Sequence, residues 1–232
     1  MKKNKIIAII PARGGSKGIP KKNIVEINGK PLISYTIDVA KKSKLIDRII
    51  VTTDNNEIAE ISKKYGAEVP FIRPSDLAED HVPTYPVIRH TLNWLDENEN
   101  YKPDLIVILE PTFPIRTPDE VDIAINKIQK DEEADSLRSV IEPFQNPFKM
   151  WKIKNKYLTP LIETGNDSYE KPRQTLERIY WQNGHIYISR YETIMNKENI
   201  HGDKILPYIL DESKFIDVDT KKDLELLRKV IK

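Results

Sequence analysis

The stretch IIAIIPARGGSKGIPKKN, from Ile6 to Asn23, joins an apolar segment to a basic loop that contains glycine. Its first part, Ile6 to Ile10, is almost entirely β-branched, which is typical of a strand covered on both faces in a parallel sheet. The loop that follows carries far more positive charge than a simple turn needs. Because open parallel sheets bind ligands beyond the carboxyl ends of their strands, this order predicts an anion-binding site.

Two later segments repeat the apolar strand pattern, namely RIIVTT (Arg48–Thr53) and DLIVIL (Asp104–Leu109). Apolar residues recur at helical spacing over 87–95 and over 121–128. The second of these helices is preceded by the capping box Thr117-Pro118-Asp119-Glu120. Alternating strands and helices indicate an α/β fold with a largely parallel sheet.

The composition fits one globular domain over residues 1–232. Hydrophobic residues make up 39% and charged residues 31% of the chain, which allows a sizeable core. Lys and Arg number 37 against 36 Asp and Glu, so the chain lacks the basic excess of general nucleic-acid-binding proteins. The absence of cysteine excludes disulfides, thiolate zinc sites and a catalytic thiol.

The N-terminal segment MKKNKIIAII starts with basic residues, but its apolar run ends at Pro11 and Arg13. Such a run is too short for a secretory signal or a membrane span. We therefore expect a soluble, cytoplasmic protein that acts neither on nucleic acid nor at a membrane.

An excursion over residues 142–176 interrupts the alternation of strands and helices. It is rich in prolines and aromatic residues: Pro143, Phe144, Pro147, Phe148, Trp151, Tyr157, Pro160, Tyr169 and Pro172. Within it, MWKIKNKYLTPL predicts two short strands around Asn155-Lys156. This much aromatic surface favours a dimerisation arm or a lid over a disordered linker. The α/β pattern then resumes with HIYISR, ILPYIL and a final helix.

The loop after the first strand supplies the groups that a phosphate site needs. Gly14 and Gly15 let backbone N–H groups approach an anion closely. The cations that can neutralise phosphate oxygens are Arg13, Lys17, Lys21 and Lys22. The spacing fits neither the Walker loop nor the dinucleotide-binding G-x-G-x-x-G pattern. A polyphosphate site of another design is therefore favoured, and a solvated basic turn is the alternative.

IIPARGGSKGIPKKNI, followed by NGKPLISYTI, resembles the N-terminal signature of the CMP-sialic acid synthetases, or acylneuraminate cytidylyltransferases. The resemblance continues in TTDNNEIAEISKKYGAEVPFIRP, LEPTFPIRT, KPRQ and IDVDTKKDL, so it touches most of the chain. It implies a Rossmann-like nucleotidyltransferase fold that joins CTP to a nonulosonic acid, a nine-carbon 2-keto sugar acid. It also implies release of pyrophosphate, use of Mg²⁺ and, usually, a homodimer. Enzymes that make CMP-legionaminic acid are included in this resemblance.

Matching the motifs position by position implies roles for single residues. The nucleotide would be bound by Arg13, Gly14, Ser16, Lys22, Asn23, Arg73 and Thr84, with Lys17 near the phosphates. The sugar acid would be bound by Glu110, Arg173, Gln174 and Asn183, with Arg173 as the partner of its carboxylate. Pro83 and Pro86 depart from the family pattern beside Thr84, so the register of that contact stays open.

The segment Phe215-Ile216-Asp217-Val218-Asp219 alternates apolar and acidic residues ahead of the final helix. In a strand, residues two apart share a face, so both carboxylates could point into one site. Oxygen ligands suit Mg²⁺, which commonly takes one or two carboxylates plus substrate phosphates. The alternative is that one aspartate only caps the helix.

The implied reaction is attack of the sugar's anomeric hydroxyl on the α-phosphorus of CTP, with pyrophosphate as the leaving group. Catalysis would consist of alignment and of charge neutralisation by Mg²⁺, Arg13, Lys17 and Lys22. Two candidates for the general base stay open: Asp217, or a sugar hydroxyl whose pKa the metal lowers.

Glu110 stands where the family usually carries glutamine, in an LQPTSP-like motif. An ionised glutamate only accepts hydrogen bonds, whereas glutamine also donates them. We expect Glu110 to accept from a hydroxyl or an N-acyl N–H and so to select a modified nonulosonic acid, such as legionaminic acid, over N-acetylneuraminic acid. The alternative is that Glu110 turns away and pairs with Arg116.

The remaining polar residues have simpler interpretations. Asp54 is interpreted as a cap of the helix after the second strand, and Asn183-Gly184 as either a plain turn or part of the sugar site. The histidines lack the spacing of metal ligands and are expected to be structural or exposed: His81, His90, His185 and His201.

Three other functions share parts of this pattern. A cytidylyltransferase for the eight-carbon sugar acid KDO has the same fold but a shorter first loop. A sugar-nucleotide-dependent glycosyltransferase would use Asp217-Val218-Asp219 as its Asp-x-Asp motif, but there the motif should follow a mid-chain strand. A non-catalytic nucleotide-binding regulator would have little use for both the phosphate cations and the paired carboxylates.

Overall fold

The computed structural model describes residues 4–163, 168–211 and 216–231. Its main elements, in chain order, are β1 (Ile6–Pro11), β2 (Glu26–Ile27), β3 (Lys30–Pro31), α1 (Leu32–Lys42), β4 (Arg48–Thr52), α2 (Asn56–Tyr65), α3 (Thr84–Glu99), β5 (Leu105–Ile108), α4 (Pro118–Gln129), β6 (Ser136–Ile141), β7 (Trp151–Lys154), β8 (Tyr157–Pro160), β9 (Trp181–Arg190), α5 (Tyr191–Asn196), β10 (Ile205–Ile209) and α6 (Lys221–Val230). Short 3₁₀ turns connect some of them, η1 (Lys22–Ile24), η2 (Ser75–Leu77), η3 (Pro147–Lys149) and η4 (Arg173–Thr175).

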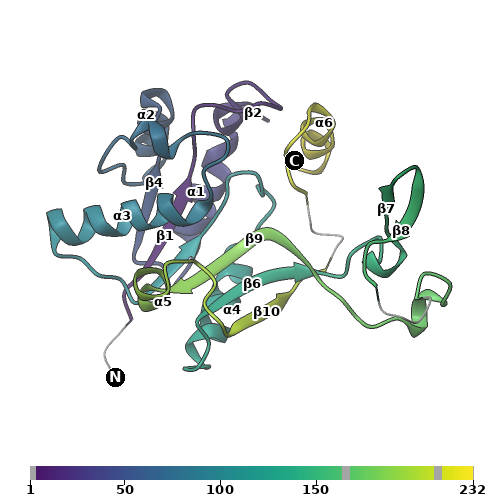
Figure 1. Ribbon diagram of the computed structural model, residues 1–232. Coiled ribbons are helices and arrows are strands. Elements are labelled where there is room, and N and C mark those ends of the chain that lie inside the picture. Colours follow the sequence, from purple (N-terminus) through teal and green to yellow (C-terminus); the bar gives the residue numbers. More distant parts are fainter. Residues whose placement is uncertain (1–3, 164–167, 212–215, 232) are drawn as a thin grey trace.

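A six-stranded sheet in the order β10-β6-β9-β5-β1-β4 forms the centre of the molecule (Figure 1). β1 pairs in parallel with β4 and β5, and β10 pairs in parallel with β6, so the predicted α/β fold with a mostly parallel sheet is confirmed. β9 is the exception, because it runs antiparallel to both β5 and β6. A parallel neighbour needs a crossover connection, usually a helix. The described part of the chain between β6 and β9 holds no α-helix, which fits the reversed direction.

The strand β1 is buried on both faces, as its β-branched sequence predicts. Ile6, Ala8 and Ile10 join the core cluster that includes residues of α1, α2 and α4. Ile7 and Ile9 join a second cluster, on the other face of the sheet, with residues of α3 and α5. The sheet is thus the middle of three layers, and its apolar strands fix where the loops at their carboxyl ends emerge.

A third, smaller hydrophobic cluster packs the first loop against the C-terminal helix α6 and the segment before it. It contains Ile19 of the first loop, Val218, and two residues of the final helix, Leu224 and Leu227. The backbone N–H of Val218 donates to the carbonyl of Thr112 (3.0 Å), so the segment before α6 lies against the loop after β5. The predicted strand over 215–219 is wrong in its described part, since residues 216–219 lie in no strand; Phe215 lies outside the described residues.

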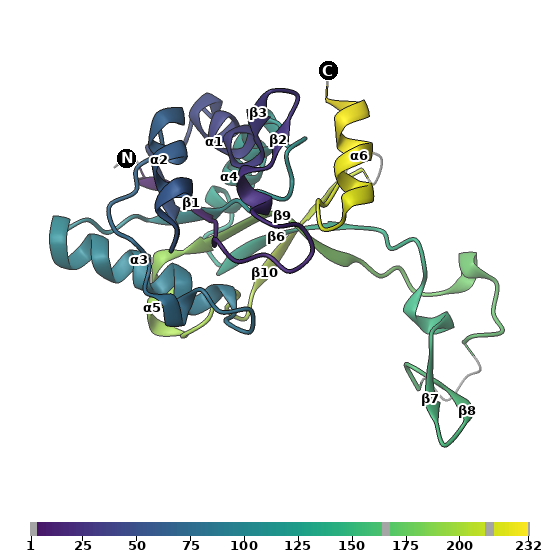
Figure 2. The ribbon, with the colours of Figure 1, turned by 90° about the horizontal axis from the view of Figure 1, so that it is seen from above.

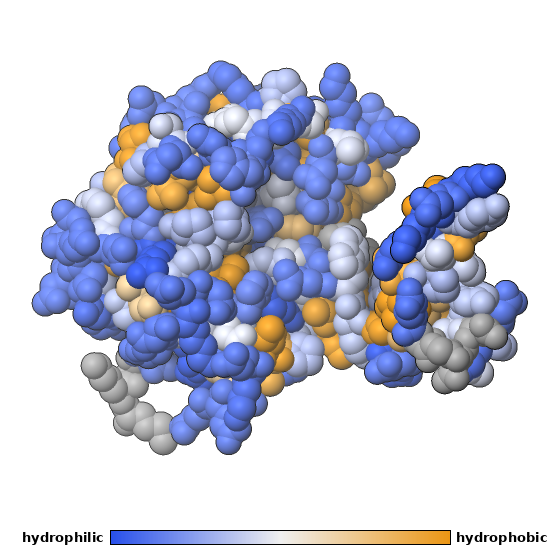
Figure 3. Space-filling view, in the orientation of Figure 1, coloured by the Kyte–Doolittle hydropathy of each residue, from blue (hydrophilic) through white to orange (hydrophobic). Residues whose placement is uncertain are grey.

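The excursion over 142–176 extends away from the body of the molecule (Figure 2). Its predicted pair of short strands is confirmed as the hairpin β7–β8, with left-handed backbone at Asn155 and Lys156. Large apolar side chains lie open to solvent here, among them Phe144 (76% exposed) and Ile153 (78% exposed). Figure 3 shows apolar surface where this arm meets the body. We call this segment the arm; residues 164–167 in it lie outside the described residues.

Across the described ranges, no helix is long and apolar enough to cross a membrane.

Candidate active site

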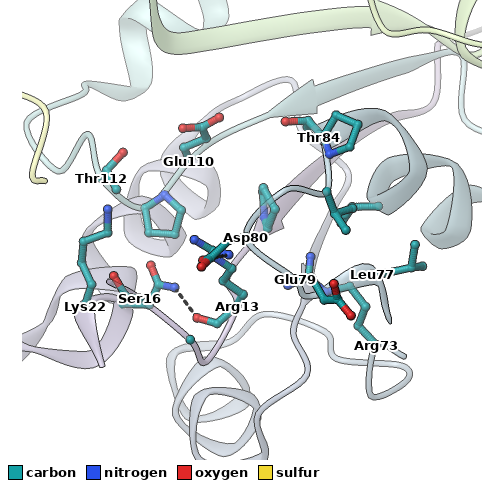
Figure 4. Close-up of a pocket in the computed structure, with 17 residues that line it drawn as sticks. Arg13, Ser16, Lys22, Arg73, Leu77, Glu79, Asp80, Thr84, Glu110 and Thr112 are labelled. Atoms are coloured by element: carbon teal, nitrogen blue, oxygen red, sulfur yellow. Dashed lines mark hydrogen bonds and ion pairs between the residues drawn. The ribbon is translucent and has the colours of Figure 1, made fainter. Parts of the chain in front are cut away.

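A pocket lies where β1 and β5 end (Figure 4). The loop after β1, the segment around η2 and the start of α3, and the residues after β5 provide its lining: Pro11, Arg13, Gly15, Ser16, Lys22, Asn23, Arg73, Leu77, Glu79, Asp80, Val82, Pro83, Thr84, Val87, Glu110, Pro111 and Thr112. Most of the residues with predicted nucleotide contacts therefore surround one cavity, and Glu110 of the predicted sugar contacts joins them. The position is the one that an open parallel sheet predicts.

Internal hydrogen bonds hold the first loop in place beside the pocket. The amide of Asn23 donates to the backbone carbonyl of Arg13 (2.9 Å), and the N–H of Gly14 donates to the carboxylate of Asp54 (2.8 Å). Gly14 does not line the pocket, whereas Gly15 does. The loop also contacts the segment before α6. A Cβ on Gly18 would lie 2.5 Å from the backbone oxygen of Asp219, so only glycine fits at this position.

The interpretation of Asp54 as a helix cap is wrong. The side chain of Asn55 accepts from the N–H of Ile58 and caps α2 instead. Asp54 is directed towards the loop, where it accepts from Gly14 and lies 3.9 Å from the guanidinium of Arg73. The sequence offers two adjacent capping residues, and only tertiary contact with the first loop decides between them.

Two of the loop cations are held by an acidic residue from the segment before α3. The guanidinium of Arg13 lies 2.5 Å and the ammonium of Lys17 lies 2.6 Å from opposite oxygens of the Asp80 carboxylate. The hydrogen bond from Lys17 lowers the pKa of Asp80, and the one from Arg13 adds to this effect. Desolvation opposes both, but the pKa is lowered on balance. Asp80 is therefore ionised at neutral pH and lies in the anion position between the two cations.

Arg73 lines the pocket and is 4% exposed. Its backbone N–H donates to the carbonyl of Thr53 (2.8 Å), which fixes the residue to the end of β4. Burial lowers the pKa of its guanidinium, and Asp54 opposes that effect. Its Nε has no hydrogen-bond partner in the described part of the chain, so a donor is left over for a polar ligand.

Acidic groups also gather around Lys22 and Thr112, which line the pocket, although Asp217 and Asp219 themselves are not among its lining residues. The ammonium of Lys22 donates to Asp219 (2.8 Å), and Thr112 hydrogen-bonds to Asp217. Burial, together with the charge of Asp219, raises the pKa of Asp217 to about 6. Burial, together with the charge of Asp217, raises the pKa of Glu110 to about 7. Burial is the larger cause of both shifts, and repulsion between the carboxylates adds to it.

The two aspartates fit a divalent cation. Oδ1 of Asp217 is buried without a hydrogen-bond partner in the described ranges, which leaves a hard oxygen donor for an ion. A cation would also relieve the repulsion that raises the pKa of this carboxyl. No group of three acidic or histidine ligands occurs among the described residues, so part of the coordination would have to come from substrate or water. The alternative that Asp217 or Asp219 caps α6 is wrong. The N-cap is Thr220, which forms a capping box with Asp223.

Asn183 and Gly184 do not form a turn. They lie within β9, and Gly184 has a φ of +78°. Asn183 is buried; its side-chain oxygen accepts from the hydroxyl of Ser139 (2.7 Å) and from the N–H of His185 (3.2 Å). Its amide nitrogen has no partner in the part of the chain that the structure describes.

The alternative that Glu110 pairs with Arg116 is also wrong. Arg116 donates to the backbone carbonyl of Glu110 (3.2 Å) and to that of His185 (2.6 Å), not to the carboxylate of Glu110, which is among the residues that line the pocket. His185 itself is buried, with Nε2 3.6 Å from the carboxylate of Glu120. This burial agrees with the structural role expected for that histidine.

The structure does not bring Arg173 and Gln174 to this pocket within one chain. They lie in the arm, where they line a separate depression with Glu142 and Asn146. The guanidinium of Arg173 donates to the carbonyl of Pro143 (3.1 Å). Figure 2 shows the hairpin β7–β8 of the arm well away from β1.

Asp80 and Thr112 are the site residues that sequence reasoning missed. Thr112 lies inside the LEPTFPIRT motif, where its distance of two residues from Glu110 was a usable signal. Asp80 gives no such signal, because it is one of several charged residues in LAEDH. Its role depends on how the segment before α3 folds back over the first loop.

Comparison with known proteins finds relatives over most of the chain. The family model described as "Cytidylyltransferase" matches residues 7–206. The chain is 33% identical over 238 residues to a CMP-N,N'-diacetyllegionaminic acid synthase of Legionella pneumophila, covering 98% of this chain and 96% of that protein. It is 32% identical to an N-acylneuraminate cytidylyltransferase of Escherichia coli, covering 97% of this chain but 51% of that longer protein.

Among solved structures, a CMP:2-keto-3-deoxy-manno-octonic acid synthetase complexed with CTP superposes with a TM-score of 0.72. The two chains are 17% identical, and 98% of each is covered, so this likeness shows the fold alone. The family match spans the first loop, the segment with Asp80 and the residues after β5. On this evidence the chain belongs to the cytidylyltransferase family.

Proposed function

We propose that this protein transfers CMP from CTP to a nonulosonic acid and releases pyrophosphate. One observation carries the proposal: a single pocket at the carboxyl ends of β1 and β5 is lined by Arg13 and Lys22 of the first loop, and Lys22 joins it to Asp219 of the acidic segment. The full-length likeness to an enzyme named for legionaminic acid supports a nine-carbon substrate. The fold is shared with a KDO-type synthetase, so the fold does not choose between the two sugar classes.

The nucleotide is assigned to the pocket in Figure 4. In this assignment Arg13, Ser16, Lys22, Asn23, Arg73 and Thr84 contact CTP, and Gly14 acts by holding the loop against Asp54. Arg13, Lys17 and Lys22 then neutralise the charge that develops on pyrophosphate as it leaves. Asp80 has to release Arg13 and Lys17 when the triphosphate binds.

Asp217 and Asp219 would hold Mg²⁺, which supplies charge neutralisation at the reacting phosphate when bound. Other residues of the chain are assigned to positioning the two aspartates. Thr112 orients Asp217 by a hydrogen bond, and the backbone pairing of Val218 with Thr112 keeps the acidic segment beside the pocket. Lys22 stands between Asp219 and the nucleotide position.

The sugar acid is assigned to the side of the pocket near Glu110, with Asn183 as a further contact. Arg173 and Gln174 would reach it from the arm of a second subunit, since their own pocket is distant. The exposed apolar side chains of the arm support a homodimer of this kind. A cytoplasmic location is part of the same proposal.

A pyrophosphate-release assay with CTP, Mg²⁺ and a panel of sugar acids tests the proposal. We expect release with at least one nonulosonic acid and much less with octulosonic acids. Release with KDO alone would establish the eight-carbon alternative, and release with none of the panel would refute the proposed reaction. Transfer from a CMP-sugar without pyrophosphate would indicate a glycosyltransferase.

A further inference from the structure

The strands β5 and β9 stop pairing just before the two segments to which the sugar acid is assigned. Their antiparallel ladder runs from Leu105↔Arg190 to Ile108↔Tyr187 and ends there. Beyond that rung β9 pairs with β6, where the register shifts between Arg138 and Val140. Backbone pairing therefore does not set the separation between Glu110 and Asn183.

One buried side chain bridges this gap. The guanidinium of Arg116 donates through Nε to the carbonyl of His185 (2.6 Å) and through Nη2 to the carbonyl of Glu110 (3.2 Å). Arg116 is 3% exposed. Its planar, rigid group holds the two carbonyls at a fixed spacing, as a further rung of the ladder would.

An aromatic ring fills the space beside this bridge. The ring of Phe113 lies 3.0 Å from the position that a Cβ on Gly184 would take, and it meets the ring of His185 edge-on at 5.9 Å between centroids. The guanidinium carbon of Arg116 lies 5.9 Å from the centre of the same ring. The loop after β5 and the strand β9 thus touch through Phe113 as well as through Arg116.

A buried arginine is a costly way to make two hydrogen bonds. Burial lowers the pKa of Arg116 to about 9, against the opposing charges of Glu110 and Glu120. No ion pair joins its guanidinium to a carboxylate anywhere in the described ranges. Such a group is hard to explain by stability alone, and its best-attested use is to fix one geometry among several.

We propose that Arg116 is a positioning residue that sets the distance between Glu110 and Asn183 and thereby governs binding and selection of the sugar acid. Arg116 does not touch the nucleotide pocket itself, since it is absent from the residues that line it. The inference rests on the proposed function, because it assigns the sugar acid to these two segments.

Arg190, the last residue of β9, offers a matched control. Its Nε donates to the carbonyl of Ala134 (2.7 Å), and its Nη2 donates to those of Ile128 (3.1 Å) and Asp131 (2.8 Å). It therefore makes the same kind of bond as Arg116, but at the carboxyl end of β9, away from His185. Lysine at either position keeps the charge and loses the fixed double contact.

The test compares R116K with R190K in the pyrophosphate-release assay, well below the melting temperature of both variants. We expect both to melt earlier than the wild type. R116K should raise the KM for the sugar acid about tenfold or more, because small misplacements of binding groups cost that much, while the KM for CTP changes little. R190K should leave both KM values close to those of the wild type.

The kcat/KM ratio between two sugar acids gives a second readout, which R116K should shift and R190K should not. Equal effects of the two variants, or an equal rise of both KM values in R116K, would overturn the inference. If R116K does not fold, F113L tests the same bridge and should raise the sugar KM in the same direction by a smaller factor; an unchanged value would refute the proposal. A wild type that releases no pyrophosphate would instead show that the proposed function has failed.

Discussion

Replacing Glu110 by glutamine should stabilise the protein at alkaline pH. The pKa of this carboxyl rises from 4.5 to about 7 on folding, because burial and the charge of Asp217 both disfavour the ionised form. The folded state therefore holds the proton more tightly than the unfolded state. Its favourable contribution is complete below pH 4.5 and is lost as the pH rises through 7.

The size of the effect follows from the shift. Each pKa unit corresponds to about 1.4 kcal/mol, so the ionised side chain costs at most roughly 3 kcal/mol above pH 7. Because Glu110 lines the pocket, water that enters the pocket should screen part of this charge, and we expect about 2 kcal/mol. Glutamine has nearly the same shape and no charge, and it escapes this cost.

The assay is urea unfolding of wild type and E110Q between pH 5 and pH 8, with a chelator and without nucleotide. E110Q should be more stable at pH 8, and the difference should shrink towards zero as the pH approaches 5. E225Q is the matched control, because Glu225 is exposed on α6, and it should show no such trend. A difference between E110Q and wild type that stays constant with pH would refute the reasoning.

Asp219→Ala should abolish turnover while metal-free CTP binding stays within a few-fold of wild type, and near-normal Mg²⁺-dependent turnover would exclude Asp219 from the site. Lys17→Ala and Arg13→Ala should each lower kcat by about 10²–10³, because a contact to a developing charge is lost. If steady-state kinetics show only a higher KM for CTP, these cations bind substrate and transition state equally. The arm should form much of a homodimer interface, so sedimentation at micromolar concentration should give a dimer, and a monomer would contradict this.

The elements that position the pocket were largely predictable. The strands β1, β4 and β5 are continuous apolar runs, and both the capping box at Thr117 and the hairpin around Asn155 follow from local chemistry. The direction of β9 could not be predicted, because the sequence HIYISR is equally compatible with a parallel and an antiparallel strand. Strand direction depends on what the preceding connection does in space.

Single side chains at the site were predictable where they belong to a long motif and not where tertiary contact decides. Arg13, Lys22 and Glu110 meet in the pocket, as their motifs indicate. Asp54 and Asp80 both pair with the first loop from other segments, and no periodicity marks either one. Asp217 and Asp219 were expected to share one face of a strand, but residues 216–219 lie in no strand, so a shared site stays a prediction.

Asp80 already pairs with Arg13 and Lys17 before the proposed nucleotide binds. The loop cations already have a counter-ion that belongs to the chain, so in the proposed mode of binding the arrival of the triphosphate would be an exchange of anions, not the filling of a bare positive site. An internal carboxylate leaves as phosphate oxygens take its place, and the net change in paired charge is smaller than the number of cations suggests. The affinity for CTP should then respond only weakly to ionic strength.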